Sequence, residues 1–372
     1  MTRETRQALM TAVKSVVVKL GTNVLANEKG LLDEAQIGRI ADQVIALESQ
    51  GRRVVIVSSG AIAAGLGDLA LPERPDALPQ LQACAAVGQA KLMMMFDLAL
   101  KRHGRHAAQI LLVRGDVEDR SRYLNIRNCI AALQAYGATA VINENDTVSV
   151  DEIRFGENDV LAAMVTNLLR ADLLVLLTTV DGVFRDKARK DRFDVVEDMS
   201  EVLAAADGTK STLGSGGMPT KLQAAGMVTQ AGEMAAIANG RRANILVDLL
   251  AGEPVGTLFL PKARKMTARR RWIGLARRAR GKIVVDAGAA RAVRARKSLL
   301  ASGITAVEGA FEAGDVVALV DPQGRAVAQG LTNYSSEDVN KIKGLRTTRF
   351  AAVLGEKTYD EVVHADNLVL TL

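Results

Sequence analysis

Four polar or glycine-rich segments of this chain have residue types that could bind a ligand, and three of them could bind a phosphate group or another anion. They are KLGTN (19–23), SSGA (58–61), NEND (143–146) and GSGGMPTK (214–221). Lysine supplies a point charge for phosphate, and glycine lets the backbone approach a ligand closely. A serine before a helix and stacked glycine amides favour a bound anion. A solvated lysine, a plain N-cap or a flexible loop would explain each segment alone, so their function depends on whether they lie together.

The third segment opens a strongly acidic stretch. Residues 144–159 hold six carboxylates against one base, Arg154. Such a stretch could bind an amino group, position lysines or help to hold Mg²⁺ on a nucleotide. A polar surface loop with Asn and Asp turns is an equally good interpretation, and the sequence leaves it open.

Common nucleotide-binding and metal-binding patterns are missing from the sequence. It has no G-x-x-x-x-G-K-[ST] loop and no G-x-G-x-x-G after a predicted strand, which argues against ordinary P-loop and dinucleotide-binding proteins. The two cysteines, Cys84 and Cys129, cannot form a disulfide framework, and no Cys/His spacing fits a metal site. We therefore expect no metal held by the protein itself.

The elements that must position these segments alternate between strands and helices. Short β-branched or apolar runs at 13–18, 54–57, 109–113, 139–142 and 173–178 predict strands. Helical patterns separate them at 33–50, 82–102, 120–136, 158–170 and 219–231, the first with Asp33 as N-cap. This alternation predicts an α/β fold, a three-layer αβα sandwich with a mostly parallel sheet. In such sheets ligands bind outside the carboxyl ends of the strands, where the polar segments lie.

The pattern of apolar residues in the sequence changes after residue 260. Short apolar runs at 283–285, 304–307, 316–320, 326–329, 350–354 and 368–372 are punctuated by Gly, Asp and Pro. This pattern predicts a small antiparallel β-barrel, interrupted by a short helix near 335–343. We expect a first domain over 1–260, a basic linker over 261–280 and a second domain over 281–372.

Composition and charge limit the classes of function. Of 372 residues, 48% are hydrophobic and 3% aromatic, so a folded core is expected but a stacking platform for single-stranded nucleic acid is not. Residues 262–300 hold 14 Lys and Arg against one acid, Asp286, which makes the basicity local. An exposed linker explains this charge better than an RNA-binding surface, although basic residues do attract phosphate backbones.

No apolar run in the sequence approaches the 18 residues of a membrane span, and the first residues show no signal-peptide pattern. We therefore expect a cytoplasmic protein with no membrane partner.

Taken together, the segments resemble the amino acid kinase family. The resemblance rests on VVVKLGTNVL (16–25), VVIVSSGAIAAG (54–65), AAVGQ (85–89), LLVRGDVEDRSRYLN (111–125), VINENDTV (141–148), GENDVLAA (156–163) and GSGGMPTKLQAA (214–225). Over the whole chain it is similar to the members that phosphorylate the γ-carboxylate of L-glutamate in the first step of proline biosynthesis. The C-terminal part resembles a PUA domain, an RNA-binding type of barrel.

The resemblance implies a role for each matching residue. The catalytic group would be Lys19, Lys221, Asp159 and Glu157, with the lysines on the transferring phosphoryl group and Asp159 keeping them in position. Glutamate would be bound by Ser59, Gly60, Asn145, Asp146 and Asn158. ATP, carrying Mg²⁺, would be bound by Lys19, Gly21, Thr178, Thr179, Ser215, Gly216, Gly217, Met218, Pro219, Thr220 and Lys221.

Three features depart from the family pattern. Thr179 stands where Asp is usual, and Glu157 replaces a usual Asp, which lengthens that carboxylate by one methylene. Ser58 and Ser215 stand where Thr is common, which is a mild chemical change.

The implied chemistry suits a site with lysines and no histidine. A side-chain carboxylate with a pKa near about 4.3 is already ionised at pH 7, so no general base is needed. Lysines, Mg²⁺, helix N-termini and loop amides would offset the repulsion between the two anions. Asp146 would bind a free α-ammonium group, which separates glutamate from N-acetylglutamate.

The resemblance also implies partners. Proline would be a feedback inhibitor, and glutamate-5-semialdehyde dehydrogenase would receive the labile acyl phosphate. The chain would form a homo-oligomer, either a dimer or a tetramer. Two alternatives stay open: a kinase for aspartate or N-acetylglutamate, and an RNA-binding role through the basic, PUA-like half.

Overall fold

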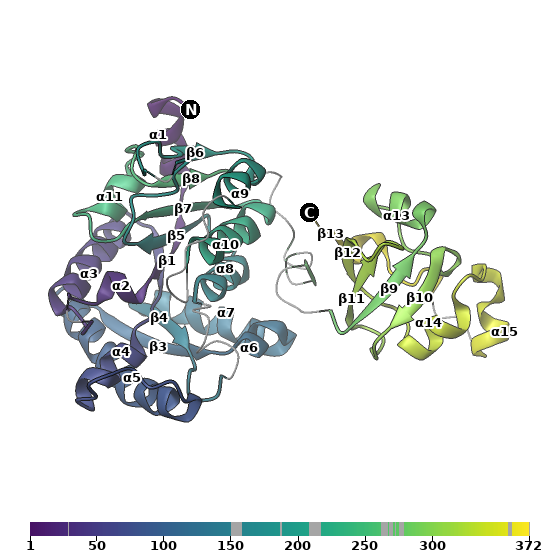
Figure 1. Ribbon diagram of the computed structural model, residues 1–372, viewed down its shortest axis with the longest axis horizontal. Helices are drawn as coiled ribbons and strands as arrows, with labels where there is room; N and C mark the ends of the chain where they lie inside the picture. The colour runs from purple at the N-terminus through teal and green to yellow at the C-terminus, as the bar shows by residue number, and fades with distance from the viewer. Residues whose placement is uncertain are drawn as a thin grey trace. The chain divides into compact units, whose positions relative to one another are not determined.

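The computed structural model describes residues 1–28, 30–149, 158–186, 188–207, 217–261, 267, 271, 273–274, 279–355 and 359–371. The chain divides into two compact units, Met1–Lys265 and Met266–Leu372 (Figure 1). Most of the expected basic linker, 261–280, lies outside the described residues.

The N-terminal unit is built on an eight-stranded sheet in the order β3-β4-β2-β1-β5-β7-β8-β6. The strands are β1 (Ser15–Leu20), β2 (Arg53–Val57), β3 (His106–Leu112), β4 (Ala138–Glu144), β5 (Leu173–Thr178), β6 (Val195–Val196), β7 (Met234–Asn239) and β8 (Thr257–Phe259). Every pair is parallel except β7 and β8. The six main parallel strands therefore end at one edge, as the sequence predicted for its five strands.

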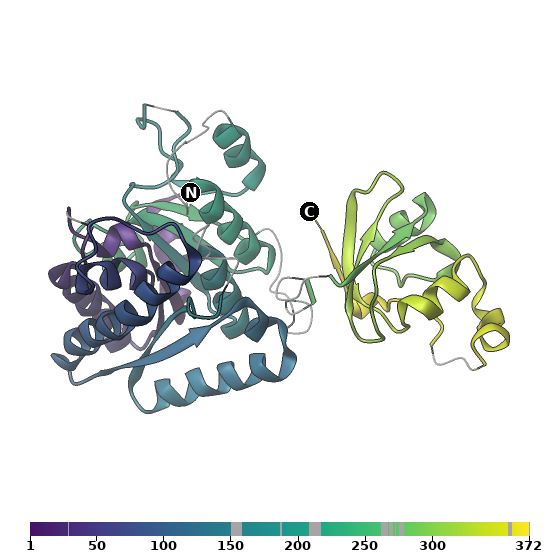
Figure 2. The same cartoon turned by 60° about the horizontal axis from the view of Figure 1, so that its bottom comes forward.

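Helices cover both faces of this sheet (Figures 1 and 2). Alternate residues of β1 enter two different cores. Val16 and Val18 pack with α3 (Glu34–Ser49), α5 (Leu78–Lys101) and α11 (Ile245–Leu250), whereas Val17 packs with α7 (Arg120–Ala135), α8 (Asn158–Leu169) and α10 (Met218–Gln230). The helices of this unit are α1 (Arg3–Ala12), α2 (Thr22–Leu25), α3 (Glu34–Ser49), α4 (Ala61–Asp68), α5 (Leu78–Lys101), α6 (Arg114–Glu118), α7 (Arg120–Ala135), α8 (Asn158–Leu169), α9 (Met199–Asp207), α10 (Met218–Gln230) and α11 (Ile245–Leu250). The three-layer αβα sandwich is confirmed.

Helix boundaries follow local signals where the sequence carries them. Asp33 caps α3 by accepting a hydrogen bond from the Gln36 amide at 3.0 Å, as predicted. Gly51, just after that helix, has a φ of +80°, a conformation that favours glycine.

Helix α5 is long and apolar enough to span a membrane by length and composition, with a mean hydropathy of 1.4 over 18 residues. The expectation that no segment reaches this threshold is therefore wrong for α5. In the structure, α5 packs Leu92, Phe96 and Leu100 into the core beside α3, as the core helix of a folded domain does.

The C-terminal unit contains a five-stranded sheet in the order β10-β9-β11-β12-β13. The strands are β9 (Gly281–Val285), β10 (Ile304–Glu308), β11 (Val316–Val320), β12 (Ala326–Leu331) and β13 (Leu368–Leu370). The pairs are antiparallel as expected, except that β9 and β11 are parallel. Helical segments complete the unit: α13 (Ala287–Arg294), η2 (Ala301–Gly303), α14 (Ser336–Ile342), η3 (Thr347–Arg349), α15 (Phe350–Leu354) and η4 (Ala365–Asn367).

One predicted strand of this unit is wrong. The run 350–354 forms α15, whereas the helix predicted near 335–343 is confirmed as α14. A five-residue apolar run does not distinguish helix from strand by its period. Here Phe350 is buried edge-on against Tyr334, with ring centroids 5.9 Å apart, and Gly355 ends the helix with a φ of +83°.

Candidate active site

Two lysines share one buried carboxylate at the carboxyl edge of the N-terminal sheet. Asp159, in the first turn of α8, is fully buried, with its Oδ1 2.8 Å from Lys19 Nζ and its Oδ2 3.1 Å from Lys221 Nζ. Lys19 lies at the end of β1, and Lys221 lies in the first turn of α10. Residues from three distant parts of the sequence therefore form one charged centre.

Thr220 also holds the Asp159 carboxylate in place. Its hydroxyl lies 2.8 Å from Asp159 Oδ2 and 2.9 Å from the Gly217 carbonyl oxygen at the N-cap of α10. The structure thus gives Thr220 a contact with Asp159, where the sequence predicted only a contact with ATP.

The charges of the centre affect one another. Burial alone raises the pKa of Asp159, but the ammonium groups of Lys19 and then Lys221 outweigh it, so that the pKa is lowered. Burial lowers the pKa of Lys19, and the attraction of Asp159 only partly opposes this, while Lys221 adds to the lowering. Two ammonium groups thus lie together on one carboxylate at the strand ends, an arrangement that suits a phosphoryl anion.

A second cluster follows β2 and β4. Asn158 Nδ2 donates to Ser59 Oγ at 3.0 Å and to Asn143 Oδ1 at 3.3 Å. Asn143 Nδ2 in turn donates to Gln89 Oε1 at 2.8 Å. Asn158 Oδ1 is buried with no hydrogen-bond partner, so it is an acceptor that a ligand could satisfy.

Gly60, next to Ser59, has a backbone conformation that determines how the chain enters α4. Gly60 has a φ of +102° as the N-cap residue of α4, a conformation that other residues rarely adopt.

The acidic turn after β4 lies at the same edge as Ser59. The Ser58 amide donates to the Ile142 carbonyl at 2.8 Å, which ties the end of β2 to β4. Asn145 and Asp146 follow directly and are both half-buried. Ser59, Asn158 and Asp146 therefore lie on the same side of Lys19, and Asn158 Oδ1 is the atom among them that is buried without a partner.

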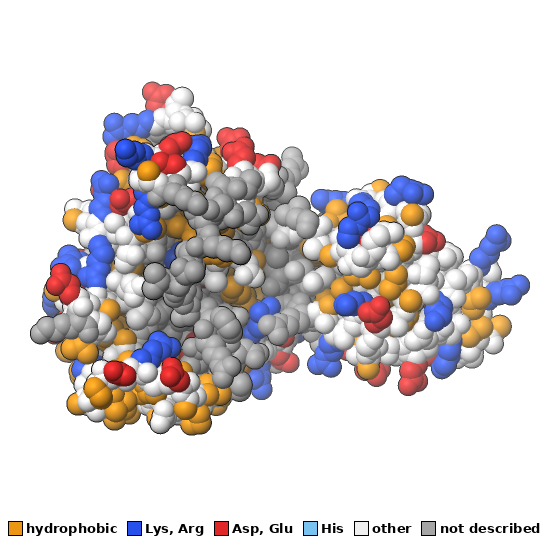
Figure 3. All heavy atoms as spheres, in the orientation of Figure 1, with side chains coloured by type: hydrophobic (Ala, Val, Ile, Leu, Met, Phe, Trp, Pro, Cys, Tyr) orange, Lys and Arg blue, Asp and Glu red, His pale blue; other side chains and the backbone are white. Residues whose placement is uncertain are grey.

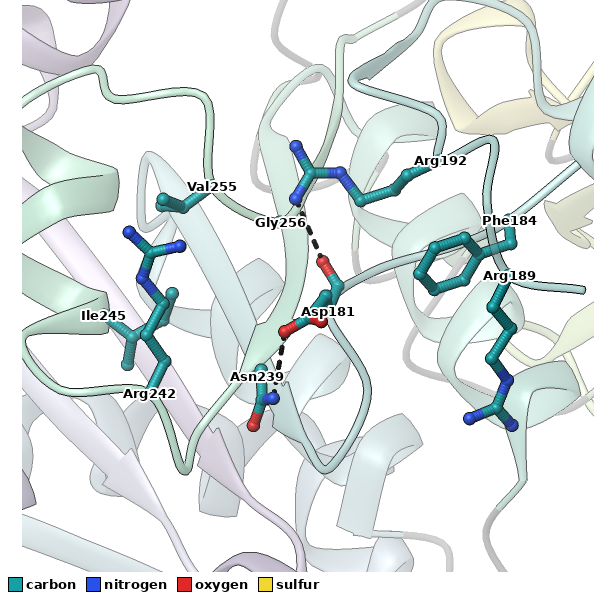
Figure 4. Close-up of a pocket in the computed structure, with 9 residues that line it drawn as sticks. All are labelled: Asp181, Phe184, Arg189, Arg192, Asn239, Arg242, Ile245, Val255 and Gly256. Carbon is teal, nitrogen blue, oxygen red and sulfur yellow. Dashed lines mark hydrogen bonds between the residues drawn. The ribbon is translucent and has the colours of Figure 1, made fainter.

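A pocket of 380 Å³ lies on the other side, at the ends of β5 and β7 (Figure 4). Its lining residues are Asp181, Phe184, Arg189, Arg192, Asn239, Arg242, Ile245, Val255 and Gly256. Asn239, which pairs with Thr178 across the two strands, donates to Asp181 Oδ1 at 2.9 Å. Three arginines against one aspartate make the pocket suitable for a polyanion.

Sequence reasoning missed most of this pocket. Asn239 ends β7, an alanine-rich strand (MAAIAN) of low β-propensity that was not predicted. The arginines are scattered along the sequence and carry no local pattern. The only signal was Asp181 and Gly182, directly after a predicted strand.

The remaining predicted residues lie as follows. Gly21 is the N-cap residue of α2, and its amide donates to the Leu177 carbonyl at 3.4 Å. Thr178 ends β5 and Thr179 follows it, exposed. Met218 and Pro219 open α10. Glu157, Ser215 and Gly216 lie outside the described residues.

Within the described parts of the chain, no group of three or more His, Cys, Asp and Glu side chains could hold a metal ion.

Comparison with known proteins assigns the chain to a class. Residues 14–239 match the amino acid kinase family, and residues 281–354 match the PUA domain. The chain belongs to the amino acid kinase family and carries a C-terminal PUA domain.

Curated relatives narrow the class. The chain is 45% identical over 371 residues to the glutamate 5-kinase of Syntrophotalea carbinolica, covering 98% of this chain and 99% of that protein. It is 46% identical over 361 residues to the glutamate 5-kinase of Caldanaerobacter subterraneus, covering 95% and 97%. Among solved structures, carbamate kinase from Giardia lamblia bound to AMP-PNP shares the fold, with a TM-score of 0.50 and 21% identity over 67% of this chain and 99% of that one.

Proposed function

We propose that this chain transfers the γ-phosphoryl group of MgATP to the γ-carboxylate of L-glutamate, the first step of proline biosynthesis. The relatives named glutamate 5-kinase match it over nearly its whole length. The observation that carries the proposal is the pair of buried lysines on Asp159, with a polar cluster on one side and a cationic pocket on the other.

The strand order supports this assignment of substrates. β1 lies between β2 and β5, so Lys19 stands between the cluster at β2 and β4 and the pocket at β5 and β7. Glutamate in the cluster and ATP in the pocket would meet at Lys19. The Lys19 and Lys221 ammonium groups would then contact the transferring phosphoryl group from the β1 and α10 sides.

Glutamate binding would use charge and amide groups. The Asp146 carboxylate would pair with the α-ammonium group, and the unpartnered Asn158 Oδ1 would accept a hydrogen bond from it. Ser59 Oγ and the backbone at Gly60 and Asn145 would hold the carboxylates. A substrate without a free ammonium group, such as N-acetylglutamate, would offer the Asp146 carboxylate no cation, which disfavours this alternative.

Phosphate binding would use the start of α10. Gly217, Met218, Pro219 and Thr220 open this helix, whose positive dipole end favours phosphate. From the resemblance, Gly21, Ser215 and Gly216 would add backbone amides, Glu157 would stand beside Asp159, and Thr178 and Thr179 would border the nucleotide. Thr179 stands where relatives usually carry Asp. Asp181, two residues later, supplies the pocket with a carboxylate.

The chemical step needs charge stabilisation rather than a base. The acceptor carboxylate is ionised at neutral pH, so no proton must be removed. Mg²⁺ would enter with ATP and neutralise part of the phosphate charge. Asp159 would hold both lysine ammonium groups where negative charge develops.

Further partners are proposed on the resemblance. We expect a homo-oligomer, inhibition by proline, hand-off of the acyl phosphate to glutamate-5-semialdehyde dehydrogenase, and action in the cytoplasm, where free thiols such as Cys84 and Cys129 persist. RNA binding by the PUA domain is a second activity to test, since Arg291 and Arg294 on α13 add basic charge to this unit.

The test is ADP release with MgATP and L-glutamate, L-aspartate or N-acetyl-L-glutamate, with hydroxylamine present to trap an acyl phosphate. We expect hydroxamate only with L-glutamate. Hydroxamate from L-aspartate or N-acetyl-L-glutamate instead would assign a different amino acid kinase. No turnover of any of the three by folded protein would overturn the proposal.

A further inference from the structure

The N-terminal helix α1 lies outside the region 14–239 that matches the kinase family, and the proposed chemistry does not use it. Its residue Arg6 is nevertheless buried, with 2% of its surface exposed. A buried guanidinium group is costly unless it is paired and hydrogen-bonded, so its partners indicate what the helix holds.

Arg6 joins two segments that are distant in sequence. Its Nη1 lies 2.9 Å from Asp194 Oδ1, directly before β6. Its Nη2 donates to the Val255 carbonyl oxygen at 2.9 Å, in the turn before β8. This planar, two-sided contact fixes the turn relative to Asp194 in a way that a flexible point charge would not.

Helix α1 contacts the same turn at two further points. Gly252, with a φ of +85°, lies so close to α1 that a Cβ there would be 2.6 Å from the Gln7 Cα. Arg3 forms a surface ion pair with Glu253. The close contacts at Gly252 and Val255 therefore hold this turn against α1, whereas the exposed pair of Arg3 and Glu253 contributes little.

This turn is part of the cationic pocket. Val255 and Gly256 line the pocket, and Figure 4 shows them with Arg192 along one side of it. Arg192 donates to the Pro254 carbonyl oxygen at 2.7 Å and lies 3.7 Å from Asp194 Oδ1. The Asp194 carboxylate thus stands between Arg6, which belongs to α1, and Arg192, which belongs to the pocket.

We infer that α1 is a positioning element for the nucleotide pocket, and that Arg6 is its positioning residue, holding the Val255 turn and, through Asp194, the Arg192 guanidinium. The inference rests on the proposed function, because it takes this pocket as the place where ATP binds. Arg6 is not itself one of the lining residues, so its effect would pass through Val255, whose carbonyl oxygen it contacts, and through Asp194 to Arg192.

The test compares Arg6→Met with Arg3→Gln in the full-length protein. Arg6→Met should raise the KM for MgATP about tenfold, within the roughly hundredfold that a misplacement of about 1 Å can cost. The KM for L-glutamate should stay within about twofold, because the glutamate cluster lies across β1. Arg3→Gln removes a pair on the same helix whose arginine side chain is 73% exposed, and it should change neither KM.

A second variant and a binding measurement separate positioning from simple loss of stability. Asp194→Asn removes the charge between Arg6 and Arg192 from a side chain that is 47% exposed, so the protein should fold and show the same selective rise. Titration calorimetry with AMP-PNP, without glutamate, should show the matching loss of affinity in both variants. If these variants melt at a lower temperature but bind AMP-PNP as tightly as the unaltered protein, the inference is wrong and the proposed function stands. No AMP-PNP binding by the unaltered protein would overturn the inference together with the proposed function.

Discussion

Asp159 is the residue on which both candidate catalytic lysines depend. It is fully buried and pairs with Lys19 and Lys221 at once, while Thr220 holds one of its oxygens. A single carboxylate shared between two ammonium groups fixes the positions of both. The centre therefore holds two cationic groups ready for the phosphoryl group.

Lys221→Ala should lower kcat about 100- to 1,000-fold, the scale of losing one charge-stabilising donor. Steady-state kinetics with both substrates at saturation measure this, and Lys221→Arg, which keeps a positive charge, is the matched control. Near-normal turnover by a folded Lys221→Ala protein would exclude Lys221 from catalysis.

The pH dependence should reflect Lys19. Because burial lowers its pKa, we expect kcat to fall on the alkaline side below the ordinary lysine pKa of about 10.4. Lys19→Arg should move this fall to higher pH, since arginine stays charged. An unchanged alkaline limb in the Lys19→Arg protein would contradict the assignment.

Folding stability should rise with pH through the titration of Asp159 and again through that of Lys19, in two separate pH ranges. The pKa of Asp159 is lowered, so its contribution is complete above its unfolded pKa of about 3.9 and is lost as the pH falls through the folded value. The lowered pKa of Lys19 has the same sign, because the unfolded chain binds more protons between its folded and unfolded pKa values. Between those two values stability from Lys19 rises with pH, even as activity falls.

At the scale of elements, the crossing of α4 and α5 sets the position of the glutamate cluster. A Cβ on Gly88 would lie 1.9 Å from the Ala61 carbonyl oxygen, and one on Gly65 would lie 1.8 Å from the Cys84 carbonyl oxygen. Ala61 is the first residue of α4, directly after Ser59 and Gly60. The two glycines thus allow a close helix contact that places the Ser59 segment.

Gly88→Ala should force the first turn of α4 away from α5. We expect a rise in the KM for glutamate of about tenfold with a smaller change for ATP, and a loss of stability of about 1–3 kcal/mol from overpacking. Kinetics and urea denaturation measure the two effects, with Ala90→Ser on the exposed side of α5 as control. Equal changes in both KM values would mean that α4 does not act on glutamate alone.

Local signals predicted the elements with strong patterns. The β-branched runs at 54–57 and 173–178 and the capped helix after Asp33 were found because period and capping are local properties. Strands β6, β7 and β8 were missed because they are short or alanine-rich, and their neighbours in the sheet stabilise them. The run 350–354 was predicted as a strand but forms a helix, in which Phe350 is buried against Tyr334.

At the scale of the whole molecule, α5 leaves an apolar face uncovered. Val87, Met94 and Leu98 are 40%, 55% and 52% exposed, and Figure 3 shows hydrophobic side chains gathered over the region of α4 and α5. Strand β3, beside α5, ends the sheet order. This face and this sheet edge suit contact with a second copy of the chain.

The double variant Met94→Asp/Leu98→Asp should therefore shift the protein toward the mass of a single chain of 39.6 kDa. Light scattering after size exclusion measures this. Leu203→Asp, at another leucine that is 51% exposed, should leave the mass unchanged. An unchanged mass in the double variant would place the contact elsewhere.

The sequence by itself determined the layered α/β fold, the separate β-rich C-terminal unit and the four polar segments that supply the site. These depend on residue period, turn residues and local motifs, which act over a few neighbours in the chain. The resemblance already implied that Asp159 positions Lys19 and Lys221, whereas the tertiary structure alone brought Thr220 to Asp159 and gathered scattered arginines in one pocket. It also placed α1 against the turn 252–255 beside that pocket, because such contacts depend on strand order and helix packing between segments far apart in the sequence.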